Sequence, residues 1–448
     1  MNGLDEDVSS SQTHARSLSI TTDPTSSIPS LTSKASLFPT PAKLSTMSVV
    51  KEYTINVPQE KIDRLKRRLD DVEWPSELEH AASDYGSPLK DIQRIVEYWR
   101  TKFDWRAHEE KMNQLPNFEV QVNIDKHGPL DMHFVHQKSH VPRAIPLLFV
   151  HGWPGSFLEV TKMLPLLKGG HGKPAFHVVA PSLPNYAFSG PALKRGFNVA
   201  RYAEACHKVM LALGYNEYVT QGGDWGFLIT RALAHLYPQN VKASHINWAW
   251  AAKPEEYANG TKPEPEYSER EKKQMALADR WNPFGMGDGR GYLAIQSTRP
   301  ATINFLLRDS PVGNLAWVWD KLVEWSDDYA WTEDEVCLWV SIYVFSRAGP
   351  DAASYIYYEA LHDPVEITVP IVQGYIDVPL GIADFPVELC NSPQSWRHTM
   401  GPVVFQKLYE KGGHFAGWER PEDLADGLCD MFGKGGGAYG VVHGKDGY

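Results

Sequence analysis

The sequence predicts an α/β protein built on a doubly wound, mostly parallel sheet, with an inserted helical lid and a separate N-terminal module. A continuous apolar run at residues 145–150 has the composition of a strand that is buried on both faces of a parallel sheet, and residues 176–180 are expected to form another buried strand. Together with strand-like runs that begin at residues 218 and 241, they alternate with helical patterns. This βαβα order is typical of a doubly wound sheet.

The elements expected before the sheet are two helices and a hairpin. Pro58 stands at a helix-start position, and an apolar stripe follows it as far as Leu69. A second amphipathic helix is expected over residues 89–103. Strand-like runs at 118–124 and 132–136 flank a glycine-containing turn, which predicts a hairpin. These elements carry no recognisable chemistry, so we expect them to serve packing.

Changes of composition divide the chain into segments. The first residues are rich in Ser, Thr and Pro without a hydrophobic period, which predicts disorder. From residue 251 the α/β pattern gives way to a mostly helical, aromatic-rich stretch, and the glycine-rich end is expected to be mobile. The predicted segments are a disordered extension (1–46), the N-terminal module (47–140), the first part of the core (141–250), the helical lid (251–362), the second part of the core (363–432) and the tail (433–448).

The composition is that of a soluble globular protein, with 42% hydrophobic and 22% charged residues among 448. A formal net charge of −11 argues against a nucleic-acid partner, because phosphate binding requires a clustered positive surface. The four cysteines are widely spaced, as is typical of reduced thiols in a cytoplasmic protein. No apolar run reaches the roughly 18 residues that span a bilayer, so we expect no membrane anchor.

The stretch from residue 218 to 237, YVTQGGDWGFLITRALAHLY, combines a short strand, a glycine turn and an amphipathic helix. This order is that of the nucleophile elbow of α/β-hydrolases, which is normally written Gly-x-Ser-x-Gly. Asp224 stands at the position of the serine. Gly222 and Gly226 suit such a turn, because it brings backbones close together. The sequence therefore predicts an α/β-hydrolase core with Asp224 as the nucleophile.

Two further motifs supply the groups that an elbow requires. The oxyanion hole of this fold uses the backbone N–H after the nucleophile, here that of Trp225, and one from an upstream loop. The turn at 151–154 ends a predicted strand and offers the N–H of Trp153. His414 follows two glycines near the end of the chain, as the base does in the order nucleophile, acid, histidine.

The acid that orients the histidine is not decided by spacing. Asp377, Asp384 and Glu388 all lie after the lid and before His414. Asp377 falls within an apolar run that we expect to be a strand, at residues 367–382. All three remain candidates at this point.

An aspartate nucleophile indicates the class of substrate. The carboxylate is already ionised at neutral pH and needs no base to attack. Alkylation at a saturated carbon gives an ester that water can hydrolyse, whereas a serine would give an ether. The substrate is therefore expected to be an epoxide or an alkyl halide.

The leaving group distinguishes these two substrates. An epoxide oxygen needs an acid, for which tyrosine is suitable, and the lid holds Tyr292, Tyr355, Tyr357 and Tyr358. A halide needs N–H donors, which Trp225 would suit. Haloalkane or haloacid dehalogenation is therefore the alternative activity, and a non-catalytic ligand-binding protein is the alternative of another class.

At several places the sequence resembles the microsomal-type epoxide hydrolases, from about residue 53 to residue 431. The resemblance includes the DWRAHEEKMNQLPNFEVQV stretch of the N-terminal module. The other motifs are HGWPGSF at 151–157, GGDWG at 222–226, GYLAIQSTRP at 291–300, DSPVG at 309–313, FPVEL at 385–389 and GGHFAGWERPE at 412–422.

The resemblance implies roles for individual residues. It implies that Asp224 is the nucleophile, His414 the base and Glu388 the acid. The lid motif implies that Tyr292 donates a proton to the epoxide oxygen. A second donor is expected two residues before a glutamate, which corresponds to Tyr357, with Tyr355 and Tyr358 as alternatives.

The resemblance also implies that the N-terminal module is a wrapping module, which surrounds the hydrolase core and the lid, and it implies the setting of the reaction. The partners would be a lipophilic epoxide and water, without a metal or another cofactor. Soluble fungal and bacterial members lack a membrane anchor and can dimerise, so we expect a cytoplasmic homodimer. Detoxification and the catabolism of aromatic hydrocarbons are the expected roles.

Overall fold

The computed structural model describes residues 49–281, 287–363, 371 and 374–448. The disorder expected for residues 1–46 lies outside this range. The strands are β1 (Val50–Glu52), β2 (Asn117–Ile124), β3 (Gly128–Gln137), β4 (Ile145–Val150), β5 (Phe176–Pro181), β6 (Tyr218–Gly222), β7 (Val241–Ile246), β8 (Leu380–Asp384) and β9 (Val403–Leu408). The helices are α1 (Gln59–Asp70), α2 (Leu89–Thr101), α3 (Trp105–Asn113), α4 (Val199–Ala212), α5 (Trp225–Leu236), α6 (Glu255–Ala258), α7 (Glu269–Trp281), α8 (Gly291–Thr298), α9 (Pro300–Asp309), α10 (Pro311–Glu324), α11 (Glu333–Val344), α12 (Tyr355–Leu361), α14 (Ala416–Glu419) and α15 (Pro421–Phe432).

The strands form one mixed sheet in the order β1-β2-β3-β5-β4-β6-β7-β8-β9. From β5 to β9 every pairing is parallel, and the β2–β3 hairpin adds antiparallel strands at one edge. The predicted fold class is therefore confirmed. Since β4 and β6 are parallel neighbours with Val150 opposite Gly222, the turn at 151–154 and the elbow meet at the carboxyl ends of these central strands.

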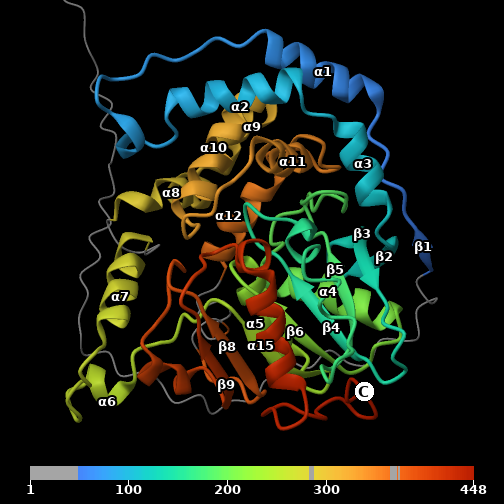
Figure 1. The fold of residues 1–448 in the computed structure, drawn as a ribbon, viewed down its shortest axis with the longest axis vertical. Helices are drawn as coiled ribbons and strands as arrows, with labels where there is room; N and C mark the ends of the chain where they lie inside the picture. The colour runs from blue at the N-terminus through green and yellow to red at the C-terminus, as the bar shows by residue number, and fades with distance from the viewer. Residues whose placement is uncertain (1–48, 282–286, 364–370, 372–373) are drawn as a thin grey trace, which may run out of the picture. The chain divides into compact units, whose positions relative to one another are not determined.

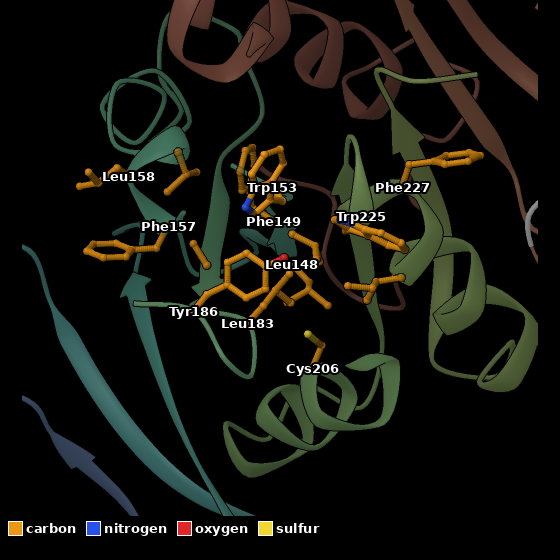
Figure 2. Close-up of a cluster of buried hydrophobic side chains, with 14 of the residues drawn as sticks. Leu148, Phe149, Trp153, Phe157, Leu158, Leu183, Tyr186, Cys206, Trp225 and Phe227 are labelled. Atoms are coloured by element: carbon orange, nitrogen blue, oxygen red, sulfur yellow. The ribbon is translucent and has the colours of Figure 1, made fainter. Parts of the chain in front are cut away.

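The core strands are held by apolar burial on both faces. Every residue of β4 is buried, as are almost all residues of α5, which packs against β4, β6 and β7. Phe149 of β4, Phe157 and Tyr186 belong to a cluster of buried side chains that includes Trp153 and Trp225 (Figure 2). The backbone that carries these two tryptophans is thus anchored in the core.

Helices α6–α12 lie between β7 and β8 in the chain, where the lid was expected. The N-terminal helices α1 and α2 pack on α10 and α11, and all four lie together beyond one end of the sheet (Figure 1). The ion pair Arg68–Asp309 joins α1 to α9, and the ion pair Arg94–Glu333 joins α2 to α11. The N-terminal helices therefore pack against helices of the segment between β7 and β8. No helix in the described part of the chain is long and apolar enough to cross a membrane.

The strand expected at residues 367–382, with Asp377 inside it, is wrong in its described part before Leu380. Asp377 is exposed and lies in a loop, and within the described residues the strand begins at Leu380. Residues 364–370 and 372–373 of the expected strand lie outside the described range. The physical reason for the loop is that the Arg231 side chain donates to the carbonyls of Ile371, at 2.9 Å, and of Gly374, at 2.5 Å. These carbonyls therefore bond to a side chain rather than to a strand.

The glycine-rich tail is also not free of the core. The Gly447 N–H donates to the Arg143 carbonyl, and the Gly447 carbonyl accepts from the Ala175 N–H, both at 2.8 Å. Val442 is 3% exposed. Gly447 has φ +86°, so here glycine provides the turn that brings the end of the chain back to the sheet.

Candidate active site

Asp224 occupies a strained turn between β6 and α5. Its φ is +50° and its ψ is −131°, a conformation that non-glycine residues avoid and that is found preferentially at functional sites. A Cβ added at Gly226 would lie 1.9 Å from the Val150 carbonyl oxygen, so only glycine lets α5 start this close to β4. The elbow thus presents a carboxylate at the carboxyl end of the central strands.

Trp153 has its backbone amide at this carboxylate, and Trp225 follows Asp224 directly in the chain. The Trp153 N–H donates to Asp224 Oδ1 at 2.7 Å. Trp225 is the first residue of α5, where N–H groups lack partners within the helix and the helix dipole is positive. One oxygen of Asp224 is therefore held in a positive environment.

His414 connects the second oxygen of Asp224 to Glu388. Its Nε2 is 3.3 Å from Asp224 Oδ2, and its Nδ1 is 2.6 Å from Glu388 Oε1. Glu388 is completely buried and His414 is 5% exposed. Burial alone would lower the pKa of His414. The charges of Glu388 and Asp224, and the hydrogen bonds to both carboxylates, outweigh this effect and raise that pKa well above its usual value. In the free protein this imidazole is a cation between two carboxylates.

The other two candidate acids do not contact the imidazole. Asp377 is exposed in its loop. Asp384 ends β8 and pairs with Arg397, and both side chains are 1% exposed. It also accepts hydrogen bonds from Arg270 at 2.9 Å and from Gln274 at 2.7 Å. Asp384 therefore ties helix α7 to the sheet.

Replacing Asp384 by Asn is expected to reduce the free energy of unfolding by about 3–5 kcal/mol, because the buried Arg397 would lose its counter-charge. Urea unfolding monitored by circular dichroism measures this loss. Glu388→Gln is the matched control at an equally buried carboxylate, and it should affect turnover more than stability. A change of less than about 1 kcal/mol in Asp384→Asn would contradict this structural role.

Tyr357 and Tyr292 approach the site from the lid. The ring of Tyr357 lies edge-on against Trp225, with centroids 4.8 Å apart, and 5.9 Å from the ring of Tyr292. Tyr292 stacks on Trp153 at 5.4 Å with an interplanar angle of 9°. Burial, with added effects that include the Asp224 charge, raises the pKa of both phenols well above their usual value. Both side chains therefore stay protonated at neutral pH.

The alternative tyrosines of α12 face elsewhere. Tyr355 is 39% exposed. Tyr358 stacks on His362 with ring centroids 3.9 Å apart. Of the three tyrosines on this helix, it is thus Tyr357 that packs against the tryptophans of the elbow and of the upstream turn.

The prediction from the sequence did not include Glu159. This residue lines a small cavity together with Asp224 and His414. Burial raises the pKa of its carboxyl to about 8, which favours the protonated form at neutral pH. The available sequence signal is its spacing from Ser156, which caps the short 3₁₀ helix after the turn, and that signal indicates a helix start rather than a site.

Comparisons with known proteins agree with this architecture. The family model for the epoxide hydrolase N terminus matches residues 50–160, and that for the alpha/beta hydrolase fold matches residues 145–270. A putative epoxide hydrolase from Stigmatella aurantiaca is 36% identical over 391 residues, which cover 85% of this chain and 84% of the relative. Epoxide hydrolase 1 from Oryctolagus cuniculus is 32% identical over 414 residues, which cover 86% and 89%.

Solved structures show the same similarity. The structure of Aspergillus niger epoxide hydrolase has a TM-score of 0.74 at 31% identity and covers 85% of this chain and 95% of its own. Juvenile hormone epoxide hydrolase from the silkworm Bombyx mori has a TM-score of 0.75 at 28% identity, with 85% and 93% covered. The identity to these relatives extends over both the N-terminal module and the hydrolase core, and the chain therefore belongs to the epoxide hydrolase family.

Proposed function

We propose that this protein hydrolyses an epoxide to a vicinal diol through a covalent ester of Asp224. The observation that carries the proposal is that the two oxygens of the Asp224 carboxylate have different partners. Oδ1 accepts the Trp153 N–H at 2.7 Å, and Oδ2 lies 3.3 Å from His414 Nε2. One oxygen is thus placed to remain a carbonyl and the other to react.

In the first step, Asp224 Oδ2 attacks the less hindered carbon of the oxirane. The new C–O ester bond forms as the C–O bond of the ring breaks, and the released oxygen takes a proton from Tyr292 or Tyr357. Both phenols are protonated at neutral pH because burial raises their pKa. They therefore serve as acids for an oxygen that would otherwise leave as an alkoxide.

In the second step, water attacks the ester carbonyl carbon. His414 Nε2 takes a proton from this water, and Glu388 stabilises the imidazolium that forms. The amides of Trp153 and Trp225 stabilise the negative charge on the carbonyl oxygen. Collapse of the tetrahedral intermediate breaks the bond between the acyl carbon and the ester oxygen, and the second proton of the attacking water passes to this leaving oxygen. The diol is released, the Asp224 carboxylate is restored, and the proton on His414 returns to the phenolate through water.

The first step also prepares the base for the second. The charge and hydrogen bond of Asp224 are among the causes that raise the pKa of His414 in the free protein. Alkylation makes Asp224 a neutral ester, so these contributions disappear while the lowering effect of burial remains. The pKa of His414 therefore falls when the ester forms, although the Glu388 charge still raises it, and the fall favours the neutral imidazole that the second step needs.

Glu388→Gln is expected to slow hydrolysis of the ester by about 10² to 10⁴-fold, because the imidazolium loses its partner. The hydrolysis rate should rise with pH as His414 loses its proton. Since the Glu388 charge raises the pKa of His414, the variant should show this rise at lower pH than the wild type. Single-turnover rates measured between pH 5 and pH 9 test both effects, and an unchanged profile would contradict the pairing.

A single-turnover reaction in ¹⁸O-labelled water tests the proposed function directly. Hydrolysis of an Asp224 ester places one labelled oxygen in the Asp224 carboxylate, which mass spectrometry of the peptide detects. Direct attack of water on the epoxide would label the diol instead and overturn the mechanism. Chlorinated and brominated alkanes are the control substrates, since halide release would favour a dehalogenase.

We further propose a lipophilic substrate, a cytoplasmic location and a homodimer, with a role in detoxification or in the catabolism of aromatic hydrocarbons. The tryptophans and tyrosines around Asp224 support an apolar substrate. All four cysteines are buried and free, which suits a reducing compartment. A panel of styrene-type, fatty-acid and terminal alkyl epoxides tests the substrate class, and sedimentation equilibrium tests the dimer against the 50.4 kDa chain.

A further inference from the structure

Lys321 of α10 carries a buried ammonium inside the lid. Its side chain is 7% exposed. Three aromatic rings surround the Nζ atom, with centroids 4.8 Å away for Tyr292, 5.5 Å for Trp281 and 5.9 Å for Trp325. Asp320, the preceding residue, forms an ion pair with it. The two tryptophans are almost fully buried, so the cation is held in an aromatic cage rather than in water.

Such a position is costly, since an ammonium loses strong hydration when it is buried, and the ion pair with Asp320 offsets only part of that loss. A solely structural lysine would extend to solvent and lay its methylene groups along the apolar surface. Cation–π attraction offsets part of the cost, and tryptophan is the best partner for it. Yet the ring nearest to Lys321 is the phenol of Tyr292 rather than either indole.

The phenol that Lys321 contacts is in an unfavourable environment for an acid. Burial, followed by the charges of Asp224 and Glu388 among its other causes, raises the pKa of Tyr292 well above its usual value. A phenol of this kind holds its proton strongly, and a developing phenolate would be repelled by the carboxylates. A cation against its ring acts in the opposite direction.

We propose that Lys321 is a positioning residue for Tyr292, and that its ammonium stabilises the negative charge which the phenol acquires as it protonates the epoxide oxygen. The inference rests on the proposed function. As the Asp224–carbon bond forms and the oxirane C–O bond breaks, the proton moves from Tyr292 to the oxirane oxygen, and Lys321 keeps all of its own protons. The ring of Tyr292 also stacks on Trp153, so this ring contacts both the ammonium of Lys321 and the turn that carries the Trp153 amide.

A double-mutant cycle tests the proposal with rapid-quench measurements of ester formation and ester hydrolysis. Lys321→Met keeps the length and burial of the side chain without the charge, and should slow ester formation by about 10- to 100-fold while hydrolysis of the ester changes little. Lys321→Arg, which keeps the charge, should recover part of the loss. Tyr292→Phe keeps the ring of the cage but removes the acid, so Lys321→Met should have less than about a twofold effect in that background.

The outcomes separate this inference from the proposed function. If wild type forms no ester, both are overturned. If wild type forms the ester and Lys321→Met slows its formation equally with and without the Tyr292 hydroxyl, or in neither case, Lys321 serves packing alone. Should Lys321→Met fail to fold, Asp320→Asn decides, because it keeps the ammonium and removes its counter-ion. It should speed ester formation about two- to fivefold only when Tyr292 is present, and an unchanged or lower rate overturns the inference.

Discussion

Replacing His414 by Gln is expected to stop the reaction after one equivalent of epoxide has been consumed. Attack by Asp224 requires an ionised carboxylate and no base, so ester formation should stay within about tenfold of the wild-type rate. Hydrolysis requires a base at Nε2, and its loss should slow this step by about 10³-fold or more. Mass spectrometry of the intact protein should show a persistent adduct with the mass of one substrate molecule.

His235→Gln provides the matched control for this experiment. His235 lies in the last turn of α5, the helix that begins at the elbow, but its side chain is exposed. The control should turn over like the wild type and show no adduct. Steady turnover in His414→Gln, or an adduct that disappears as fast as in the wild type, would exclude His414 as the base.

Local sequence patterns were sufficient for the elbow but not for its acid. The strand, turn and helix at residues 218–237 follow from hydrophobic period and glycine placement, which are properties of neighbouring residues. The choice among Asp377, Asp384 and Glu388 depends on which backbone after β8 reaches His414, and on Arg397, which pairs with Asp384. These are tertiary contacts, and spacing does not contain them.

Composition was misleading where residues serve turns or side-chain contacts. The glycine-rich tail was expected to be mobile, yet Gly447 exchanges two hydrogen bonds with the core. Neither Glu159 nor Lys321 belongs to a motif that indicates a site, because a glutamate at a helix start and a lysine on a helix are ordinary in sequence. Their surroundings, a cavity beside Asp224 and an aromatic cage, come from segments far apart in the chain. The resemblance to a family does not indicate them either, because neither residue lies in one of the motifs that carry the resemblance.

Replacing both Tyr292 and Tyr357 by Phe is expected to slow ester formation by at least about 10³-fold, because the oxirane oxygen would leave as an unprotonated alkoxide. Each single replacement should cost about 10- to 100-fold, since the second phenol can still donate. The rings remain, so the packing against Trp153 and Trp225 is kept and the free energy of unfolding should change by less than about 1 kcal/mol. Rapid-quench measurement of the ester, combined with urea unfolding, tests rate and stability separately.

Tyr355→Phe is the control on the same helix, because its exposed side chain lies on another face of α12 and should leave the rate unchanged. An active Tyr292→Phe, Tyr357→Phe double variant would mean that the leaving oxygen needs no phenol. Halide release by that variant from a bromoalkane would then favour the dehalogenase, since a halide leaves without a proton. Loss of ester formation with epoxides, together with an unchanged fold, would instead assign the acid to this pair, because both hydroxyls are removed without altering the rings that shape the site.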